Sequence, residues 1–205
     1  MVKKNSWILM LPLLFTFLFG GCEPKDVVTE TEYLSDTSLA WYPFSGYSNV
    51  VFEIDTAELE FYSTGVEIYF ERVRYMTESG GFTAGQENYY ASMERRKIEF
   101  VSDSTTYTIT YLLERNKGEI GDWDVLRVIL ADGAFQQNEV KIITFRTSGW
   151  DYGESPSRAA QVLNGKTFSN VYFNEQERRP QALYVNRLQG VVGFKSISDE
   201  VWTLK

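Results

Sequence analysis

Histidine is absent from this chain of 205 residues, and the only cysteine is Cys22. Without histidine there can be no Ser-His-Asp triad and no zinc site built on imidazole ligands. A single cysteine cannot form a disulfide within the chain, so stability has to come from a packed core and from strand pairing. The 28 aromatic residues that follow position 21 suit this purpose, because each can bury a large apolar area.

The absence of several sequence motifs excludes further classes of enzyme. The sequence has no Gly-x-Ser-x-Gly nucleophile elbow and no glycine-rich phosphate loop followed by Lys-Ser or Lys-Thr. Two acidic clusters offer oxygen ligands to calcium, Asp122-Trp123-Asp124 and Asp151-Tyr152-Gly153-Glu154, but neither fits an EF-hand loop. We expect a strand start at the first cluster and a turn at the second. The sequence therefore predicts no metal, no cofactor and no enzymatic activity.

The longest apolar run is too short to span a membrane. It extends over 13 residues, from Trp7 to Phe19, whereas a transmembrane helix needs roughly 20. Lys3 and Lys4 precede it, and Gly20-Gly21 follow it. A cationic start, an apolar stretch and small residues before a cleavage point are the three parts of a secretory signal. We expect residues 1–21 to be a signal peptide.

The residues around the cysteine, Leu18-Phe19-Gly20-Gly21-Cys22, resemble the lipobox of bacterial lipoproteins. In that family the thiol is alkylated with diacylglycerol and the chain is cut before the cysteine. The resemblance implies fatty-acid chains, such as palmitate, on Cys22 and a membrane as partner. Phe19 stands where the family prefers leucine. The alternative is an ordinary secretory signal that happens to be followed by a cysteine.

The residues after the cysteine bear on the location. Glu23 stands where some bacteria use aspartate to retain lipoproteins at the inner membrane, and Lys25-Asp26 partly resembles a surface-export signal of Bacteroidota-type lipoproteins. We expect attachment to the outer membrane, facing either the periplasm or the cell surface.

The mature chain is acidic. Residues 22–205 carry 18 basic and 28 acidic side chains, a net charge of −10, which disfavours nucleic acid as a partner. The charge is uneven, with a net −13 over residues 22–157 and +3 over 158–205. This asymmetry favours two packed sub-regions or one domain with a polarised surface.

Residues 22–40 are predicted to be the lipidated cysteine and a flexible acidic tether, because they show no sustained periodicity. A flexible coil of ~18 residues would span roughly 20–25 Å. The all-β domain is expected over 41–205, with sub-regions 41–147 and 158–205 joined by a connector at 148–157.

The body of the chain shows strand periodicity, and no segment longer than ten residues shows a helical pattern. The clearest strand has Tyr107, Ile109, Tyr111 and Leu113 alternating with threonines. A phase slip at Glu71-Arg72 predicts a β-bulge there. Asn164-Gly165 is either a type I′ hairpin turn or the end of a short helix from Ser155, and we favour the hairpin. The fold class is all-β, an antiparallel sandwich or barrel-like structure with few or no helices.

The C-terminal meander has a recognisable but loose pattern. It includes Leu163-Asn164-Gly165-Lys166-Thr167-Phe168, Leu183-Tyr184-Val185, Gly190-Val191-Val192-Gly193-Phe194 and Val201-Trp202-Thr203-Leu204. This part is similar to the C-terminal ends of small Bacteroidota-type lipoproteins of unknown function. The resemblance supports the location and the fold and implies no activity.

Aromatic residues are the candidate ligand-binding side chains. Trp41, Tyr42 and Phe44 form the densest cluster, and Trp150 and Tyr152 lie on the connector. Exposed rings beside polar groups can contact sugars or anchor a protein partner, and the alternative is that they close one end of the core.

These observations favour a lipid-anchored cell-envelope protein that acts as a non-catalytic binding or assembly module, with an envelope protein or a glycan as its partner. One alternative is an envelope glycan hydrolase that uses a pair of carboxylates. A second is a carbohydrate-binding accessory protein, and a third is a barrel that carries a lipid inside.

Overall fold

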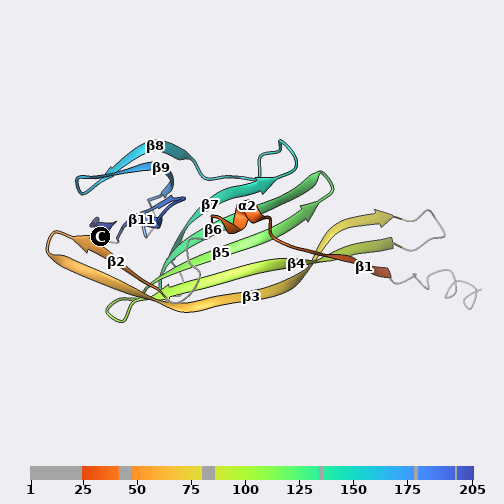
Figure 1. Cartoon of the computed structure of the whole chain (residues 1–205), viewed down its shortest axis with the longest axis horizontal. Helices are drawn as coiled ribbons and strands as arrows, with labels where there is room; N and C mark the ends of the chain where they lie inside the picture. Colours follow the sequence, from red (N-terminus) through yellow and green to blue (C-terminus); the bar gives the residue numbers. More distant parts are fainter. Residues whose placement is uncertain (1–24, 42–47, 80–85, 134–135, 178–179, 197) are drawn as a thin grey trace, which may run out of the picture.

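The regular secondary structure of the described chain is almost entirely β-strand, which confirms the all-β prediction (Figure 1). The computed structural model describes residues 25–41, 48–79, 86–133, 136–177, 180–196 and 198–205. Within these ranges the one helix is the single turn α2 (Asp36–Leu39). The strands are β1 (Lys25–Glu32), β2 (Asn49–Ile54), β3 (Ala57–Ser79), β4 (Gln86–Val101), β5 (Tyr107–Gly118), β6 (Gly121–Asp132), β7 (Gln136–Arg146), β8 (Ser157–Leu163), β9 (Lys166–Glu175), β10 (Ala182–Asn186), β11 (Gly190–Lys195) and β12 (Val201–Leu204).

All the described strands belong to one sheet, which is curled into a half-barrel. Its order is β7-β6-β5-β4-β3-β2-β12-β11-β10-β9-β8, and β1 pairs with β4 outside this path. Two antiparallel meanders, one from each sub-region, meet where Glu53 and Phe52 of β2 pair with Thr203 and Leu204 of β12. The two sub-regions therefore share a single sheet. No helix among the described residues has the length and the apolar character to cross a bilayer.

β7 and β9 are not paired in the sheet, and side-chain hydrogen bonds connect them instead. Asn138 on β7 donates from Nδ2 to the backbone oxygens of Asn174, at 3.2 Å, and Pro180, at 3.1 Å. Asn174 donates from its own Nδ2 to the oxygen of Glu139, at 3.0 Å. The segment before β8 covers the edge of β7, since Ser155 exchanges two hydrogen bonds of 2.9 Å with the backbone of Lys141. This contact covers part of the β7 edge, which would otherwise be open to pairing with another chain.

The main core lies on the concave side of the half-barrel. Phe52, Phe61 and Phe194 are fully buried and meet edge to face, with ring centroids 5.2–6.4 Å apart. The alternating residues of β5, β6 and β7 complete this core, as their period of two predicts.

A second, smaller core explains why buried and exposed residues do not alternate along β10 and β11. The β8–β9 hairpin packs Leu163, Phe168 and Val171 with Ala182 and Tyr184 of β10. Since Leu183 and Val185 of the same strand belong to the main core, β10 is buried on both faces.

The hairpin interpretation of residues 157–175 is confirmed. Asn164 and Gly165 connect β8 to β9 with φ angles of 46° and 80°, and two positive φ angles are characteristic of a type I′ turn.

A long arm extends from the half-barrel (Figure 1). It consists of residues 66–79 of β3, residues 86–93 of β4 and the whole of β1, which pairs in parallel with β4 from Lys25–Glu87 to Glu32–Met93. β5 pairs with β4 only from Arg95 to Val101, so β1 takes over the same side of β4 where β5 departs. Several large apolar side chains of β3 are exposed here, including Ile68 at 54% and Phe70 at 46%.

The prediction of a flexible tether is wrong for residues 25–40, which form β1 and α2. The physical reason is long-range pairing. The acidic residues of β1 meet basic residues of β5, as when Lys117 bonds Glu32 over 2.7 Å, and these partners are 85 positions apart. The periodicity of one segment does not indicate a partner that lies so far away in the sequence. Cys22 and Glu23 lie outside the described residues.

The predicted bulge at Glu71-Arg72 is also wrong. The β3–β4 register runs without interruption from Val66 to Arg74, and its shifts fall between Ser63 and Val66 and between Arg74 and Met76. The sequence pattern does not report burial here, because both faces of β3 are largely exposed between residues 66 and 78.

Candidate functional site

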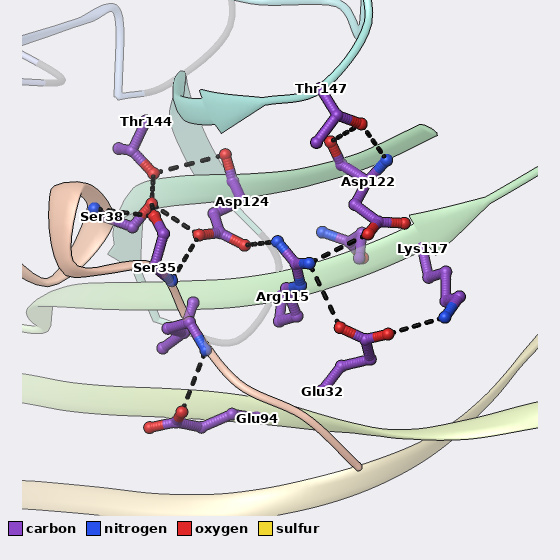
Figure 2. A network of polar contacts seen from close by, with 12 residues as sticks. Glu32, Ser35, Ser38, Glu94, Arg115, Lys117, Asp122, Asp124, Thr144 and Thr147 are labelled. Carbon is purple, nitrogen blue, oxygen red and sulfur yellow. Dashed lines mark hydrogen bonds and ion pairs between the residues drawn. The ribbon is translucent and has the colours of Figure 1, made fainter. Parts of the chain in front are cut away.

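A network of charged groups fastens β1 and α2 to the half-barrel (Figure 2). At its centre lies Arg115 of β5, which donates to Glu32 of β1 at 3.2 Å and to Asp122 and Asp124 of β6 at 3.1 and 3.2 Å. Lys117 also bonds Glu32, as described above. The network therefore connects the N-terminal segment to two neighbouring strands of the sheet.

Asp124 is the most buried member of this network, with no exposed surface. Its Oδ2 accepts hydrogen bonds from the backbone N–H of Ser35, at 2.9 Å, and from the hydroxyl of Ser38, at 2.7 Å. Ser35 is also the N-cap of α2, because its hydroxyl accepts from the N–H of Ser38 at 3.1 Å. Thr144 of β7 donates to the Ser38 hydroxyl at 2.7 Å. The helical turn is thus held from both ends.

Opposite charges shift the pKa values of Glu32, Arg115 and Lys117. Burial by itself would raise the pKa of Glu32, but hydrogen bonds and charges from Lys117 and then Arg115 outweigh it and hold this pKa below its ordinary value. Burial would lower the pKa of Arg115, and its bonds with Asp124 and Glu32 raise it instead. The pKa of Lys117 is raised against burial by Glu30 and Glu32. Since each of these acids forms an ion pair with Arg115 or Lys117, the network is suited to holding the segment in place.

The network determines where Trp41 lies. The backbone N–H of Trp41 donates to Ser38 at 3.0 Å, directly after α2. The indole packs against the main core and meets Tyr172 of β9 edge to face, with ring centroids 5.9 Å apart and an interplanar angle of 70°. The guanidinium carbon of Arg187 lies 5.1 Å from the centre of the same ring, within the range of a cation–π contact.

These three residues line a pocket of about 460 Å³. This volume falls within the range of small-ligand sites. The described residues that line it include aromatic, cationic and small polar side chains but no carboxylate: Trp41, Ser157, Arg158, Ala159, Asn170, Tyr172 and Arg187. Burial raises the pKa of the Tyr172 phenol, and the charge of Glu154 adds to the effect, so this phenol remains a neutral donor at physiological pH.

The two arginines of the pocket are in different electrostatic situations. Arg158 forms two bonds with the carboxylate of Glu175, at 3.1 and 3.2 Å, and stacks on Phe173 at 3.8 Å. Arg187 makes no ion pair with any residue that the structure describes. Its guanidinium therefore keeps its hydrogen-bond donors available to a ligand.

A second pocket, of about 650 Å³, contains the acids that a glycan hydrolase would need. Glu175 and Glu177 line it together with Tyr184 and Lys195. Glu175 already binds Arg158, and it accepts the hydroxyl of Tyr184 at 3.1 Å. Both oxygens of the Glu175 carboxylate are therefore engaged in contacts within the protein.

The structure separates the other predicted aromatic residues. Trp150 is 61% exposed. Tyr152 stacks on Trp123 with centroids 4.3 Å apart and bonds the hydroxyl of Ser148, so it serves to attach the connector. Tyr42 and Phe44 lie outside the described residues.

The two acidic clusters considered for calcium are engaged in other contacts. Asp122 and Asp124 pair with Arg115, as described above. Asp151 accepts the N–H of Gly153 at 2.8 Å, in a turn, and Glu154 accepts that of Ile143 at 3.1 Å. No group of three or more potential metal ligands occurs among the residues that the structure describes.

Sequence reasoning identified Trp41 but missed its neighbours in the pocket. Asn170 and Tyr172 belong to β9, and Arg187 lies in the turn between β10 and β11. They lie far from Trp41 along the chain and form no motif. The uneven charge, positive over residues 158–205, was the one available signal.

Comparisons with known proteins do not add to this geometry: no protein-family model matches the chain, and neither a curated protein nor a solved structure matches it.

Proposed function

We propose that this protein is a lipid-anchored bacterial envelope protein that acts as a non-catalytic binding module. The pocket at Trp41 is the observation that carries the binding role. Its described lining combines two aromatic rings with two arginines and small polar groups, and it contains no carboxylate and no nucleophile next to a base. Such a lining can hold a ligand, but it offers no group to cleave one.

The anchor rests on the sequence around Cys22, and the arm supplies a reason for its position. Lys25, where β1 begins, follows Cys22 by three residues, and three extended residues reach roughly 10 Å. A lipid on Cys22 would hold the end of the arm close to the bilayer. Residues 66–79 of β3 would then act as a stiff spacer of roughly 45 Å, in place of a flexible tether.

This arrangement would hold the binding region away from the membrane. Strands β8, β9 and β11 lie toward the end of the molecule opposite the arm (Figure 1). Attachment to the outer membrane is part of the proposal, with the leaflet open.

Labelling tests the anchor. Cells that express the full chain are grown with a clickable fatty acid, beside cells that express Cys22→Ala. We expect label on the wild type alone, and release of the variant into the soluble fraction. Equal labelling of the two proteins would overturn the lipid anchor. Protease treatment of intact cells then distinguishes the surface from the periplasmic side.

A further inference from the structure

We propose that the pocket at Trp41 binds an acidic sugar, a hexuronate residue of a glycan, whose carboxylate is held by Arg187. The proposal rests on the binding role given above and adds the chemical class of the ligand. It depends on three features of the pocket: an arginine that forms no ion pair with a described residue, aromatic rings held in place before a ligand arrives, and polar side chains without hydrogen bonds to the described residues.

Arg187 supplies the charge recognition. A guanidinium offers parallel N–H donors that match the two oxygens of a carboxylate. The contact with Trp41 holds the guanidinium beside the pocket, 5.1 Å from the ring centre, and no described carboxylate lines the same pocket to compete for it. Arg158, by contrast, already binds Glu175. An anionic ligand would therefore form an ion pair with Arg187 without displacing an ion pair between described residues.

Trp41 and Tyr172 supply the apolar contact. Their edge-to-face packing at 5.9 Å fixes both rings, and the network around Asp124 fixes the backbone leading to Trp41. Because the rings are positioned in advance, little side-chain entropy is lost when a ligand binds. Pyranose rings have an apolar face of C–H groups that can pack against the exposed parts of such aromatic rings.

The small polar residues favour a sugar over an apolar carboxylate. The side chains of Asn170 and Ser157 line the pocket and make no hydrogen bond to any residue that the structure describes. An amide and a hydroxyl can both donate and accept, which suits the hydroxyl groups of a sugar. A fatty acid offers no hydroxyl groups along its chain to bond them.

The negative charge of the remainder of the chain favours a single acidic sugar over a long polyanion at this pocket. Residues 22–157 carry a net −13, so polyanions are repelled from most of the surface. Residues 158–205, which supply most of the pocket, carry +3. A single acidic sugar at the pocket is therefore favoured over a long polyanion such as nucleic acid.

A pair of matched ligands tests the proposal. The full-length protein, purified in detergent micelles, is titrated calorimetrically with a tetramer of galacturonic acid and with the same tetramer after reduction of its carboxylates to alcohols. We expect the acidic tetramer to bind at least about 10-fold more tightly, since a hydrogen-bonded charge pair contributes roughly that factor or more. Raising the salt concentration should weaken binding of the acidic form.

Variants locate the binding site. Arg187→Gln should weaken binding of the acidic tetramer about 10- to 100-fold and leave the reduced tetramer almost unaffected. Arg146→Gln removes the same charge from an exposed position on β7 and should change nothing. Trp41→Leu should weaken both tetramers, whereas Trp150→Leu should weaken neither.

The outcomes separate this inference from the proposed function. Equal binding of the two tetramers, or equal effects of Arg187→Gln and Arg146→Gln, would overturn the acidic-sugar assignment and leave the binding role in place. Binding of neither tetramer would also overturn the assignment, and labelling at Cys22 would still decide the anchor. Cleavage of either tetramer would overturn the non-catalytic function itself.

Discussion

The guanidinium of Arg115 donates to the fully buried carboxylate of Asp124 across 3.2 Å, between two paired strands. The same carboxylate holds the backbone of the N-terminal segment at Ser35. One buried ion pair thus connects the sheet to the segment that carries Trp41. Removing the Asp124 carboxylate is costly, because Arg115, Ser35 and Ser38 all lose hydrogen bonds at a buried site.

Asp124→Asn should therefore destabilise the protein by about 3 kcal/mol, because one amide oxygen cannot replace both carboxylate oxygens for Arg115, Ser35 and Ser38. Urea unfolding followed by tryptophan fluorescence measures the loss. Asp103→Asn makes the same chemical change at an exposed position in a loop and should alter stability by less than about 0.5 kcal/mol. Similar small losses in both variants would show that the network contributes little to stability.

Glu32 predicts a pH dependence whose sign follows from its lowered pKa. A carboxyl whose pKa is lower in the folded than in the unfolded state stabilises the fold above its ordinary pKa, and this stabilisation is lost as the pH falls through the folded value. The wild type should be more stable than Glu32→Gln by a constant amount from pH 7 down to about 4.5, the ordinary value. Below that pH the difference should shrink.

Urea midpoints of the wild type and Glu32→Gln, measured in parallel at pH 6.5, 5.5, 4.5 and 3.5, test this dependence. The pKa of Glu53 is also lowered, by Lys166, but Glu53 is present in both proteins and its contribution cancels. A difference that stays constant down to pH 3.5 would mean that the ion pairs of Glu32 do not depend on its charge.

Gly190 predicts a strong packing effect at the start of β11. A Cβ at this position would lie 2.5 Å from the hydroxyl oxygen of Tyr111, which accepts the N–H of Val191 at 2.8 Å. Gly190 also has a φ of 75°. Gly190→Ala should therefore cost about 1–2 kcal/mol for the left-handed backbone and about 1–3 kcal/mol more for the overlap.

Gly165→Ala is the matched control for this effect. Gly165 has a similar φ of 80°, and a Cβ there would meet nothing within 4 Å. Thermal or urea unfolding should show a clearly larger loss for Gly190→Ala than for Gly165→Ala. In addition, Tyr111→Phe should cost less in the Gly190→Ala background than in the wild type, because it removes the atom that the new methyl group meets. Equal losses in the two alanine variants would contradict the close packing of Tyr111.

Local features of the fold were predictable from sequence. The alternation from Tyr107 to Leu113 corresponds to β5, and Asn164-Gly165 forms the hairpin turn expected of it. Both depend on neighbouring residues, because side-chain period and backbone φ preference are properties of short segments. The bulge predicted at Glu71-Arg72 is wrong because apolar alternation marks a buried face only where one face is buried, and both faces of β3 are largely exposed there.

The candidate site was predictable only in part. Trp41 stood out because aromatic residues are dense around it, but Arg187 lies 146 positions later and has no local signature. Tyr152 is a candidate of the same kind in the sequence. Only the structure shows that its ring stacks on Trp123 and so has a structural role. Aromatic content alone does not distinguish a ring that binds a ligand from a ring that fastens a loop.

The sequence by itself indicated most strand-forming segments of the body, favoured the tight turn at 164–165 and excluded histidine chemistry, because these follow from residue identity and from contacts between near neighbours. Only the tertiary structure decided that residues 25–32 form a strand of the arm and that Trp41, Tyr172 and Arg187 share one pocket. These features arise from ion pairs and packing between segments far apart in the chain, whose energies depend on distance in space and leave no periodic pattern in the sequence.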